Sequence, residues 1–214
     1  MTDSANHNAN RQADAVVEEL IQRPLIQSAF AVLSEKLPNK FVFHSLSHTK
    51  DVLREAVTFA VLDNLLPREV ELIAIAAAYH DFGFIEGSDG HEQRGADKVR
   101  EAMEAEGTFE EKEIVLVQRM ILDTHLNETH QGIRQKSTTR LSGYLLDADL
   151  SNFGRDDFFQ RLDAYVAELG SQRAVLAERT YGLMTMHEWK TDAARKLREA
   201  KKRENIAALE KELG

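Results

Sequence analysis

Histidine and aspartate side chains recur in this chain at positions where they could bind metal. His44 and His48 lie four residues apart, His80 and Asp81 are adjacent, and Asp149 follows much later in the chain. The 214 residues include no cysteine, so a metal site must be built from histidine and acidic side chains. Imidazole and carboxylate ligands suit divalent Mn, Fe, Co, Ni, Zn or Mg, and they exclude Cu(I) and iron–sulfur clusters.

The adjacent pair His80 and Asp81 indicates a site for two metal ions. Neighbouring side chains on a helix point about 100° apart, so both reach metal if two ions lie side by side with Asp81 between them. Two-metal hydrolases hold their ions about 3.5–4 Å apart, a gap that one carboxylate can span. Such a centre would attract a phosphoryl group and lower the pKa of a bridging water. The predicted chemistry is hydrolysis of a phosphate ester, with Asp81 as both ligand and catalytic group.

The order of these ligands resembles that of the HD superfamily of metal-dependent phosphohydrolases. Its members carry the pattern H…HD…D, which this chain matches with His48, His80, Asp81 and Asp149. The resemblance implies that these four side chains bind one or two divalent metal ions, with Asp81 as the bridge.

Residues 43–52, Phe-His-Ser-Leu-Ser-His-Thr-Lys-Asp-Val, are similar to the Tyr-His-Asn-x-x-His-Ala-x-Asp-Val motif of class I cyclic-nucleotide phosphodiesterases. Residues 148–151 are similar to the Cys-Asp-Leu-Ser segment of the same enzymes. This likeness implies that His44 donates a proton to the leaving oxygen. Phe43 and Ser45 stand where those enzymes have Tyr and Asn, and their glutamine-based purine clamp has no counterpart that we can locate here.

A closer resemblance is to small bacterial proteins described as predicted metal-dependent HD phosphohydrolases. It covers most of residues 40–206 and is carried by residues 80–84, 90–96 and 202–206. Those proteins have no well-defined substrate, so the resemblance implies a chemistry without naming the molecule on which it acts.

Two further histidines, His91 and His125, lie between the HD pair and the last aspartate. Several HD branches place two histidines there to complete a second metal site, so the resemblance implies that both are ligands. Alternatively, His91 is a capped surface histidine at the start of a helix. His130 lies in a polar segment and is expected to face solvent, whereas His7 and His187 fall outside the pattern.

Three charged residues near these ligands have alternative roles. Arg94 shares a helix face with His91, so it is either a phosphate clamp in the catalytic site or a solvated side chain. Lys98, one turn further on, is more simply solvated. Asp147 and Asp149 are two residues apart, so on a helix only one of them can face the site. Asp149 is the one that matches the phosphodiesterase segment and the HD pattern, so the resemblance assigns Asp149 to the metal and leaves Asp147 as an acceptor or a solvated acid.

Apolar residues with helical periodicity predict one all-α domain over residues 13–214, behind a flexible N-terminus at residues 1–12. Pro24 and Pro67 mark helix starts, and residues 72–79 are apolar on nearly all sides, which is typical of a central helix. The remaining helices are expected near residues 52–62, 91–106, 108–122, 139–151, 156–169, 172–186 and 190–212. Gly83 is predicted to end the central helix, and Thr108 to begin a capping box.

No stretch alternates as a strand would, and residues 126–138 are polar without periodicity, which predicts a substrate-facing loop. The net charge of −9 argues against a long nucleic acid as partner. The N-terminus has no secretion signal and no apolar run could cross a membrane, so we expect a cytoplasmic protein. The oligomeric state is left open.

The leading interpretation is a metal-dependent phosphohydrolase acting on a small phosphate ester, a nucleotide or a related metabolite. If His91 and His125 both bind metal, the set instead resembles the di-iron HD oxygenases, of which myo-inositol oxygenase is one. A third reading is a non-catalytic HD module that senses a ligand. The complete H…HD…D set argues against this reading, because a degenerate module typically loses a ligand.

Overall fold

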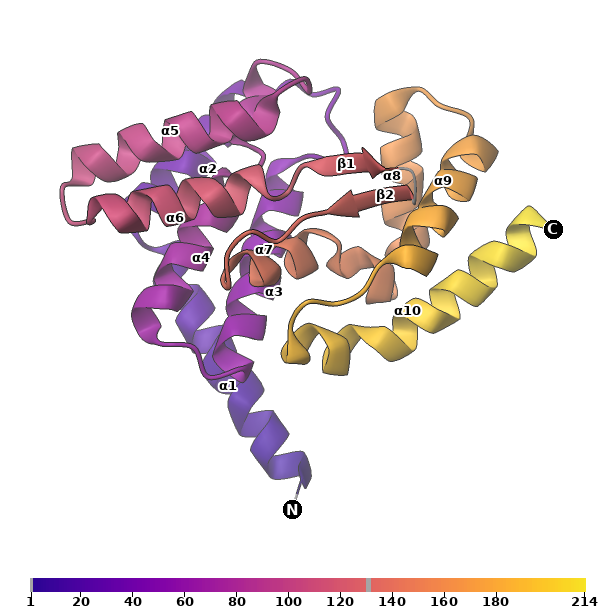
Figure 1. Cartoon of the computed structure of the whole chain (residues 1–214), viewed down its shortest axis with the longest axis horizontal. Coiled ribbons are helices and arrows are strands. Elements are labelled where there is room, and N and C mark those ends of the chain that lie inside the picture. Colours follow the sequence, from indigo (N-terminus) through magenta and orange to yellow (C-terminus); the bar gives the residue numbers. More distant parts are fainter. Residues whose placement is uncertain (1, 130–131) are drawn as a thin grey trace.

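Ten α-helices form most of the computed structural model in the part of the chain it describes (Figure 1). The described backbone covers residues 2–129 and 132–214, and the described side chains cover residues 10–127 and 133–214. The helices are α1 (Thr2–Ile21), α2 (Pro24–Lys36), α3 (Leu46–Leu62), α4 (Pro67–Tyr79), α5 (His91–Glu106), α6 (Glu111–Leu122), α7 (Ser142–Asp149), α8 (Phe158–Leu169), α9 (Arg173–Met186) and α10 (Asp192–Leu213). The predicted all-α fold is confirmed.

Helix α4 runs through the centre of the molecule, as its composition predicts. Residues 72–79 are all buried, because α2, α3, α6 and α7 pack around this helix. Pro67 begins it at a position where its missing N–H costs nothing. The helix ends at Tyr79, so its C-terminal end delivers His80 and Asp81 into the protein interior.

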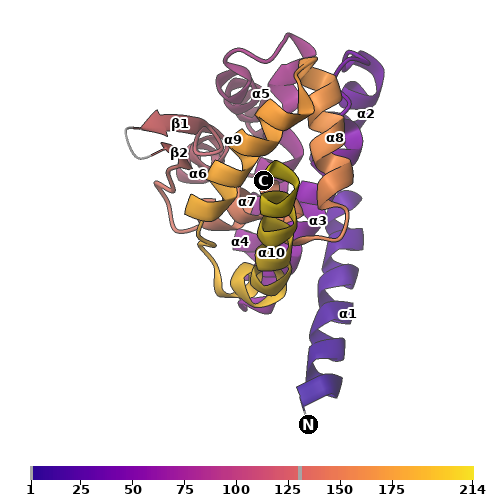
Figure 2. The same ribbon diagram turned by 90° about the vertical axis from the view of Figure 1, so that its right-hand side faces the viewer.

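The first helix packs against the bundle through its C-terminal half. Ala13, Val17 and Leu20 are buried at helical spacing against α3, whereas the earlier turns extend away from the body of the molecule (Figures 1 and 2). Residues 2–12, where we expected a flexible N-terminus, have helical backbone. Among the side chains of α1 that the structure describes, Ala13 is the first that is buried. The domain boundary and the flexibility of residues 1–12 stay predictions.

The loop predicted at residues 126–138 is wrong in its first part, which is a β-hairpin. Strands β1 (Leu126–Thr129) and β2 (Gly132–Gln135) pair antiparallel, with Leu126 opposite Gln135. Strands of four residues are too short for a period of two to be recognised, and their backbone groups satisfy each other where the chain crosses the bundle. His130, expected to face solvent, lies outside the described residues.

Two local predictions also need correction. Gly83 does not end α4 but lies within a 3₁₀ turn, η1 (Phe82–Ile85), where a Cβ would fall 2.2 Å from the carbonyl oxygen of His91. Glycine at position 83 therefore allows the backbone of η1 to approach the backbone of His91. The N-cap of α6 is Glu110, with Glu113 accepting from its N–H, because the helix begins after the residues that we took for the capping box.

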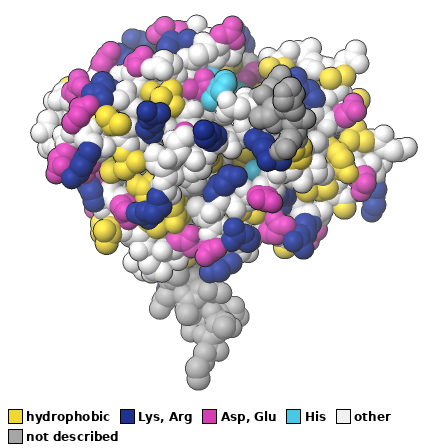
Figure 3. All heavy atoms as spheres, in the orientation of Figure 1, with side chains coloured by type: hydrophobic (Ala, Val, Ile, Leu, Met, Phe, Trp, Pro, Cys, Tyr) yellow, Lys and Arg dark blue, Asp and Glu magenta, His cyan; other side chains and the backbone are white. Residues whose placement is uncertain are grey.

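No helix among the described residues has the combined length and apolar character that a membrane span requires. On the face shown in Figure 3, basic and acidic side chains are interspersed.

Candidate metal centre

His80, which directly follows α4, has one ring nitrogen in a hydrogen bond and the other available to a metal. Nδ1 of His80 lies 2.8 Å from the carbonyl oxygen of Ala77. Because a carbonyl only accepts, Nδ1 carries the proton and Nε2 is left as the nitrogen that can bind metal. The side chain of His80 is 1% exposed, so this nitrogen cannot bind bulk water instead.

Ligand atoms from three distant parts of the chain meet at this nitrogen. Nε2 of His80 lies 3.2 Å from Oδ2 of Asp81, and Nε2 of His48, on α3, lies 3.5 Å from the same oxygen. Oδ1 of Asp149, at the end of α7, lies 3.3 Å from Nε2 of His48 and 3.7 Å from Nε2 of His80. The structure therefore brings together the four side chains of the H…HD…D pattern.

Three of these atoms have no hydrogen-bond partner although they are buried: Nε2 of His48, Nε2 of His80 and Oδ2 of Asp81. A buried polar atom without a partner costs about 1–3 kcal/mol, so three in one place require an explanation. One ligand atom from each residue lies within 4.8 Å of the others, which is close enough for a single cation to contact all three. This buried group could hold a metal ion, and it has the donor types that divalent cations use.

The electrostatics of the cluster favour ionised carboxylates. Burial alone would raise the pKa of Asp81 and of Asp149, but the adjacent histidines hold both pKa values below their usual range. Burial is the largest single influence on His80 and would lower its pKa, but the charges of Asp81 and Asp149 and the hydrogen bonds of the ring together raise this pKa to about 9. A cation entering the cluster would therefore displace a proton from His80, which couples metal binding to pH.

His44 lies beside the cluster but not on the helix that carries His48. Ser45 is the N-cap of α3 and its Oγ accepts from the backbone N–H of His48, so the chain turns between the two histidines. Their spacing of four residues therefore does not place the two rings on one face of a helix, because α3 begins after His44. The ring of His44 instead stacks on Phe84, with centroids 4.3 Å apart.

A buried carboxylate that sequence reasoning missed orients His44. Oε1 of Glu168, on α8, lies 2.5 Å from Nδ1 of His44, and Oε2 accepts from the backbone N–H groups of Phe43 and His44. Burial is the largest single influence and lowers the pKa of His44, but the hydrogen bond to Glu168 and the charges of Asp81, Glu168 and Asp149 together leave this pKa raised. Nothing in the local sequence marks Glu168, because its partner lies 124 residues away.

A cavity of about 430 Å³ opens onto these groups. Its lining combines ionisable and aromatic side chains, among them His44, Asp81, Phe84, His91, Glu92, Asp149, Tyr165 and Glu168. Cavities of about 300–1,000 Å³ accommodate small-molecule ligands, so the cluster is accessible to a metabolite-sized substrate.

The two additional histidines have different environments. Nδ1 of His91 lies 2.8 Å from the carbonyl oxygen of Ser88, which leaves Nε2 free 3.8 Å from Oδ1 of Asp81. His125 has a side chain that is 60% exposed and pairs through Nδ1 with Oε1 of Glu92 at 2.8 Å. His91 is thus placed to bind a cation on the second oxygen of Asp81, whereas His125 lies at the cavity rim.

The two aspartates of α7 make separate contacts. Asp147 is buried and accepts from the backbone N–H groups of Lys190 and Thr191 and from Oγ1 of Thr191. Burial raises its pKa to about 6. Asp149 reaches the histidines and accepts from Nε2 of Gln135 at 3.2 Å. The geometry therefore favours Asp149 as the metal-facing residue, and Asp147 anchors the segment before α10.

Arg94 has contacts that do not favour the predicted phosphate clamp. Its guanidinium donates to the carbonyl oxygens of Gly83, Gly87 and Asp89. These hydrogen bonds stabilise the loop between η1 and α5. The sequence could show that Arg94 and His91 share a helix face, but not that Arg94 binds this loop. Lys98 is exposed and pairs with Glu101.

We expect His91→Ala to remove only the weaker of two metal sites, because Nε2 of His91 faces Asp81 from outside the buried group. Titration of Mn²⁺ into metal-free protein, followed by electron paramagnetic resonance, should show two binding events in the native chain and one in the variant. His125→Ala is the matched control and should keep both. A single event in the native chain, unchanged by His91→Ala, would show that His91 is not a ligand.

Comparison with known proteins gives the fold without a function. No family model matches the chain, and no curated protein matches it. Among solved structures, it is similar to a Lactobacillus plantarum protein whose crystal structure was a Northeast Structural Genomics target. The two share 15% identity over 90% of this chain and 98% of the other, with a TM-score of 0.64. At this identity the similarity shows a common fold alone.

Proposed function

We propose that this chain is an HD-type metal-dependent phosphohydrolase that acts on a small phosphate ester, a nucleotide or a related metabolite. The observation that carries the proposal is the buried group of His48, His80 and Asp81, whose ligand atoms lack hydrogen-bond partners beside a metabolite-sized cavity. Asp149 adds a fourth ligand atom at 3.3 Å from His48.

The residues present fit a divalent metal at this site. His48, His80, Asp81 and Asp149 would hold the first ion, and His91 together with Asp81 would contribute to a second. When bound, such ions lower the pKa of water and neutralise the charge that develops on a phosphoryl group.

His44 is the proton donor in this proposal. Glu168 occupies Nδ1 of His44, so Nε2 is the nitrogen that can carry the transferred proton. The raised pKa of His44 keeps the imidazole protonated to higher pH, as a general acid requires. Phe84, stacked on the ring, restricts its rotation and keeps it at the cavity wall.

The contacts give less support to the alternative of a di-iron HD oxygenase, which requires both His91 and His125 as metal ligands. His125 pairs with Glu92 and is mostly exposed, so it does not join His91 at the buried group. The donor set of the H…HD…D pattern is complete, which favours a catalytic site over a degenerate sensing module.

The test is a metal-dependence assay on the full chain. Metal-free protein would be loaded separately with Mn²⁺, Fe²⁺, Co²⁺, Ni²⁺, Zn²⁺ or Mg²⁺, and phosphate release measured from p-nitrophenyl phosphate, nucleoside monophosphates and cyclic nucleotides. We expect release with at least one metal and its loss in His48→Ala. Oxygen uptake, followed in parallel with inositol and other polyols, would support the oxygenase instead. No phosphate release with any metal and substrate would contradict the proposal.

Glu168→Gln is expected to shift the pH dependence of hydrolysis. Glu168 raises the pKa of His44, so its neutral replacement should lower that pKa. Because the proton donor must be protonated, activity should then be lost at lower pH than in the native chain, while the metal content stays unchanged. A pH–rate profile of kcat measures this, with the exposed Glu178→Gln as control. An unchanged alkaline limb would show that Glu168 supports the backbone of residues 43 and 44 without tuning His44.

A further inference from the structure

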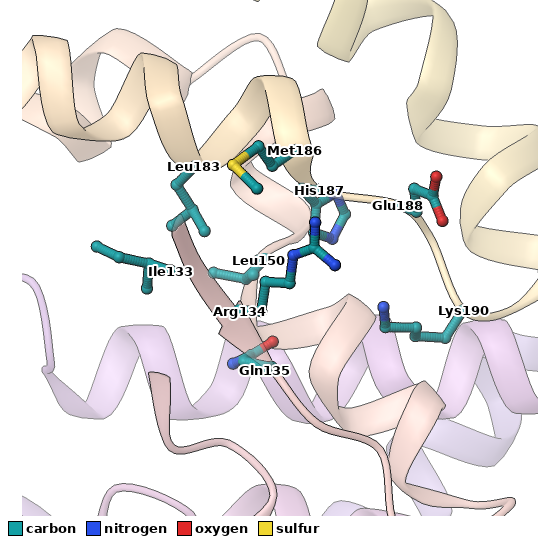
Figure 4. Close-up of a pocket in the computed structure, with 9 residues that line it drawn as sticks. All are labelled: Ile133, Arg134, Gln135, Leu150, Leu183, Met186, His187, Glu188 and Lys190. Carbon is teal, nitrogen blue, oxygen red and sulfur yellow. The ribbon is translucent and has the colours of Figure 1, made fainter. Parts of the chain in front are cut away.

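Another cavity lies between strand β2 and the segment that joins α9 to α10 (Figure 4). Its volume is about 120 Å³, which is too small for a whole metabolite and suits a single functional group or a small ion. The lining consists of Ile133, Arg134, Gln135, Leu150, Leu183, Met186, His187, Glu188 and Lys190.

Two cations face each other across this space. Figure 4 shows the guanidinium of Arg134 and the ammonium of Lys190 extending toward one another from opposite walls. Neither forms an ion pair with any residue in the described part of the chain, although most arginines there do. Glu188 is the single carboxylate of the lining and pairs with neither. The lining thus carries two positive charges and one negative charge, all on exposed side chains, in a chain with a net charge of −9.

His187 adds a neutral donor to the same wall. Its Nδ1 lies 3.2 Å from Nζ of Lys202, which also donates to the carbonyl oxygen of His187. Because an ammonium group only donates, Nδ1 accepts and the ring proton is on Nε2. Burial and the charge of Lys202 lower the pKa of His187 to about 3, so the ring stays neutral and keeps this N–H.

The two segments that line the cavity, strand β2 and the segment that joins α9 to α10, are both hydrogen-bonded to helix α7. The segment that carries Lys190 is bound through backbone N–H groups to Asp147, and the strand that carries Arg134 is bound through Gln135 to Asp149. The cations are therefore presented by backbone that does not need to rearrange, which lowers the cost of binding a ligand between them.

We propose that this cavity binds an oxyanion, a phosphate or a carboxylate group, between Arg134 and Lys190. A guanidinium fork and an ammonium group are the donors that proteins use for such groups, and neither forms an ion pair with a residue that the structure describes. Two sources share this chemistry: a free anion such as inorganic phosphate, or a second anionic group on the substrate of the adjacent site. The anion site itself does not depend on the proposed function.

The direct test is calorimetric titration of inorganic phosphate into the full chain after metal has been removed on a chelating resin. We expect Arg134→Gln and Lys190→Gln each to weaken binding about tenfold, because each removes one charge-assisted contact. Lys136→Gln, which makes the same charge change just beyond β2, should bind as the native chain does. Absence of phosphate binding to the native chain, or equal affinity in all variants, would overturn the proposal. Binding that is lost in Asp81→Ala but kept in Arg134→Gln would also overturn it, by placing the anion at the metal centre.

The two sources are separated by kinetics on the metal-loaded chain. If the site holds part of the substrate, Arg134→Gln should raise KM about tenfold for esters with a second phosphate and leave monophosphates unchanged. If it holds a free anion, both substrate types should be affected alike. Should no substrate be hydrolysed, the titration still decides whether the anion site exists, so failure of the proposed function does not hide failure of this inference.

Discussion

Asp81→Ala should reduce both the retained metal and phosphate ester hydrolysis to background. Oδ2 of Asp81 lies within 3.5 Å of Nε2 of both His48 and His80, and Oδ1 lies 3.8 Å from Nε2 of His91. The substitution therefore removes the one side chain that contacts both halves of the centre. The loss should exceed the roughly tenfold to hundredfold effect of altering an outer partner of a metal ligand.

Elemental analysis of the purified variant and assay of the same sample measure the two effects together. Asp97→Ala is the matched control, because Asp97 is exposed on α5 and bonded only to Gln93. A variant at position 81 with native metal content and activity would contradict the proposed centre. Circular dichroism distinguishes the expected loss of metal and activity from unfolding, which would lower both quantities for an unrelated reason.

His44→Ala should separate the chemistry from metal binding. The ring of His44 contacts Glu168 and Phe84 and is not among the buried atoms that lack partners, so the variant should keep its metal. Loss of a general acid typically costs about a hundredfold to ten-thousandfold in rate. The loss should be smaller for p-nitrophenyl esters, whose leaving group departs without a proton, than for alkyl esters.

Comparison of the two ester types on metal-loaded protein measures this difference. Loss of metal from His44→Ala would instead identify His44 as a ligand. An equal defect on both esters would favour a role in positioning the phosphate group. Glu168→Ala, in which the ring stays but loses its orienting carboxylate, should fall between the native chain and His44→Ala.

The fold could be predicted from the sequence because its helices carry strong periodic patterns. The uninterrupted apolar run of residues 72–79 identified the central helix, and with it the place where His80 and Asp81 enter the interior. The hairpin at residues 126–135 was missed because its strands are four residues long and polar.

The members of the candidate centre could be predicted from residue type and order, whereas their partners could not. Glu168 and Gln135 are ordinary polar residues, and only the tertiary structure brings them to His44 and Asp149. Arg94 has the residue type and position for a phosphate contact, but the sequence could not show that its guanidinium donates to carbonyl oxygens of the preceding loop. Sequence patterns indicate which side chains share a face and leave open what that face meets.

The measurement that tests the central claim most directly is anomalous diffraction from crystals of the full chain soaked in Mn²⁺. The proposed centre predicts a peak within bonding distance of Nε2 of His48, Nε2 of His80 and the carboxylates of Asp81 and Asp149. A second, weaker peak should lie between Asp81 and His91. A map with no peak among these side chains, or a structure in which Asp149 lies far from His80, would contradict the account.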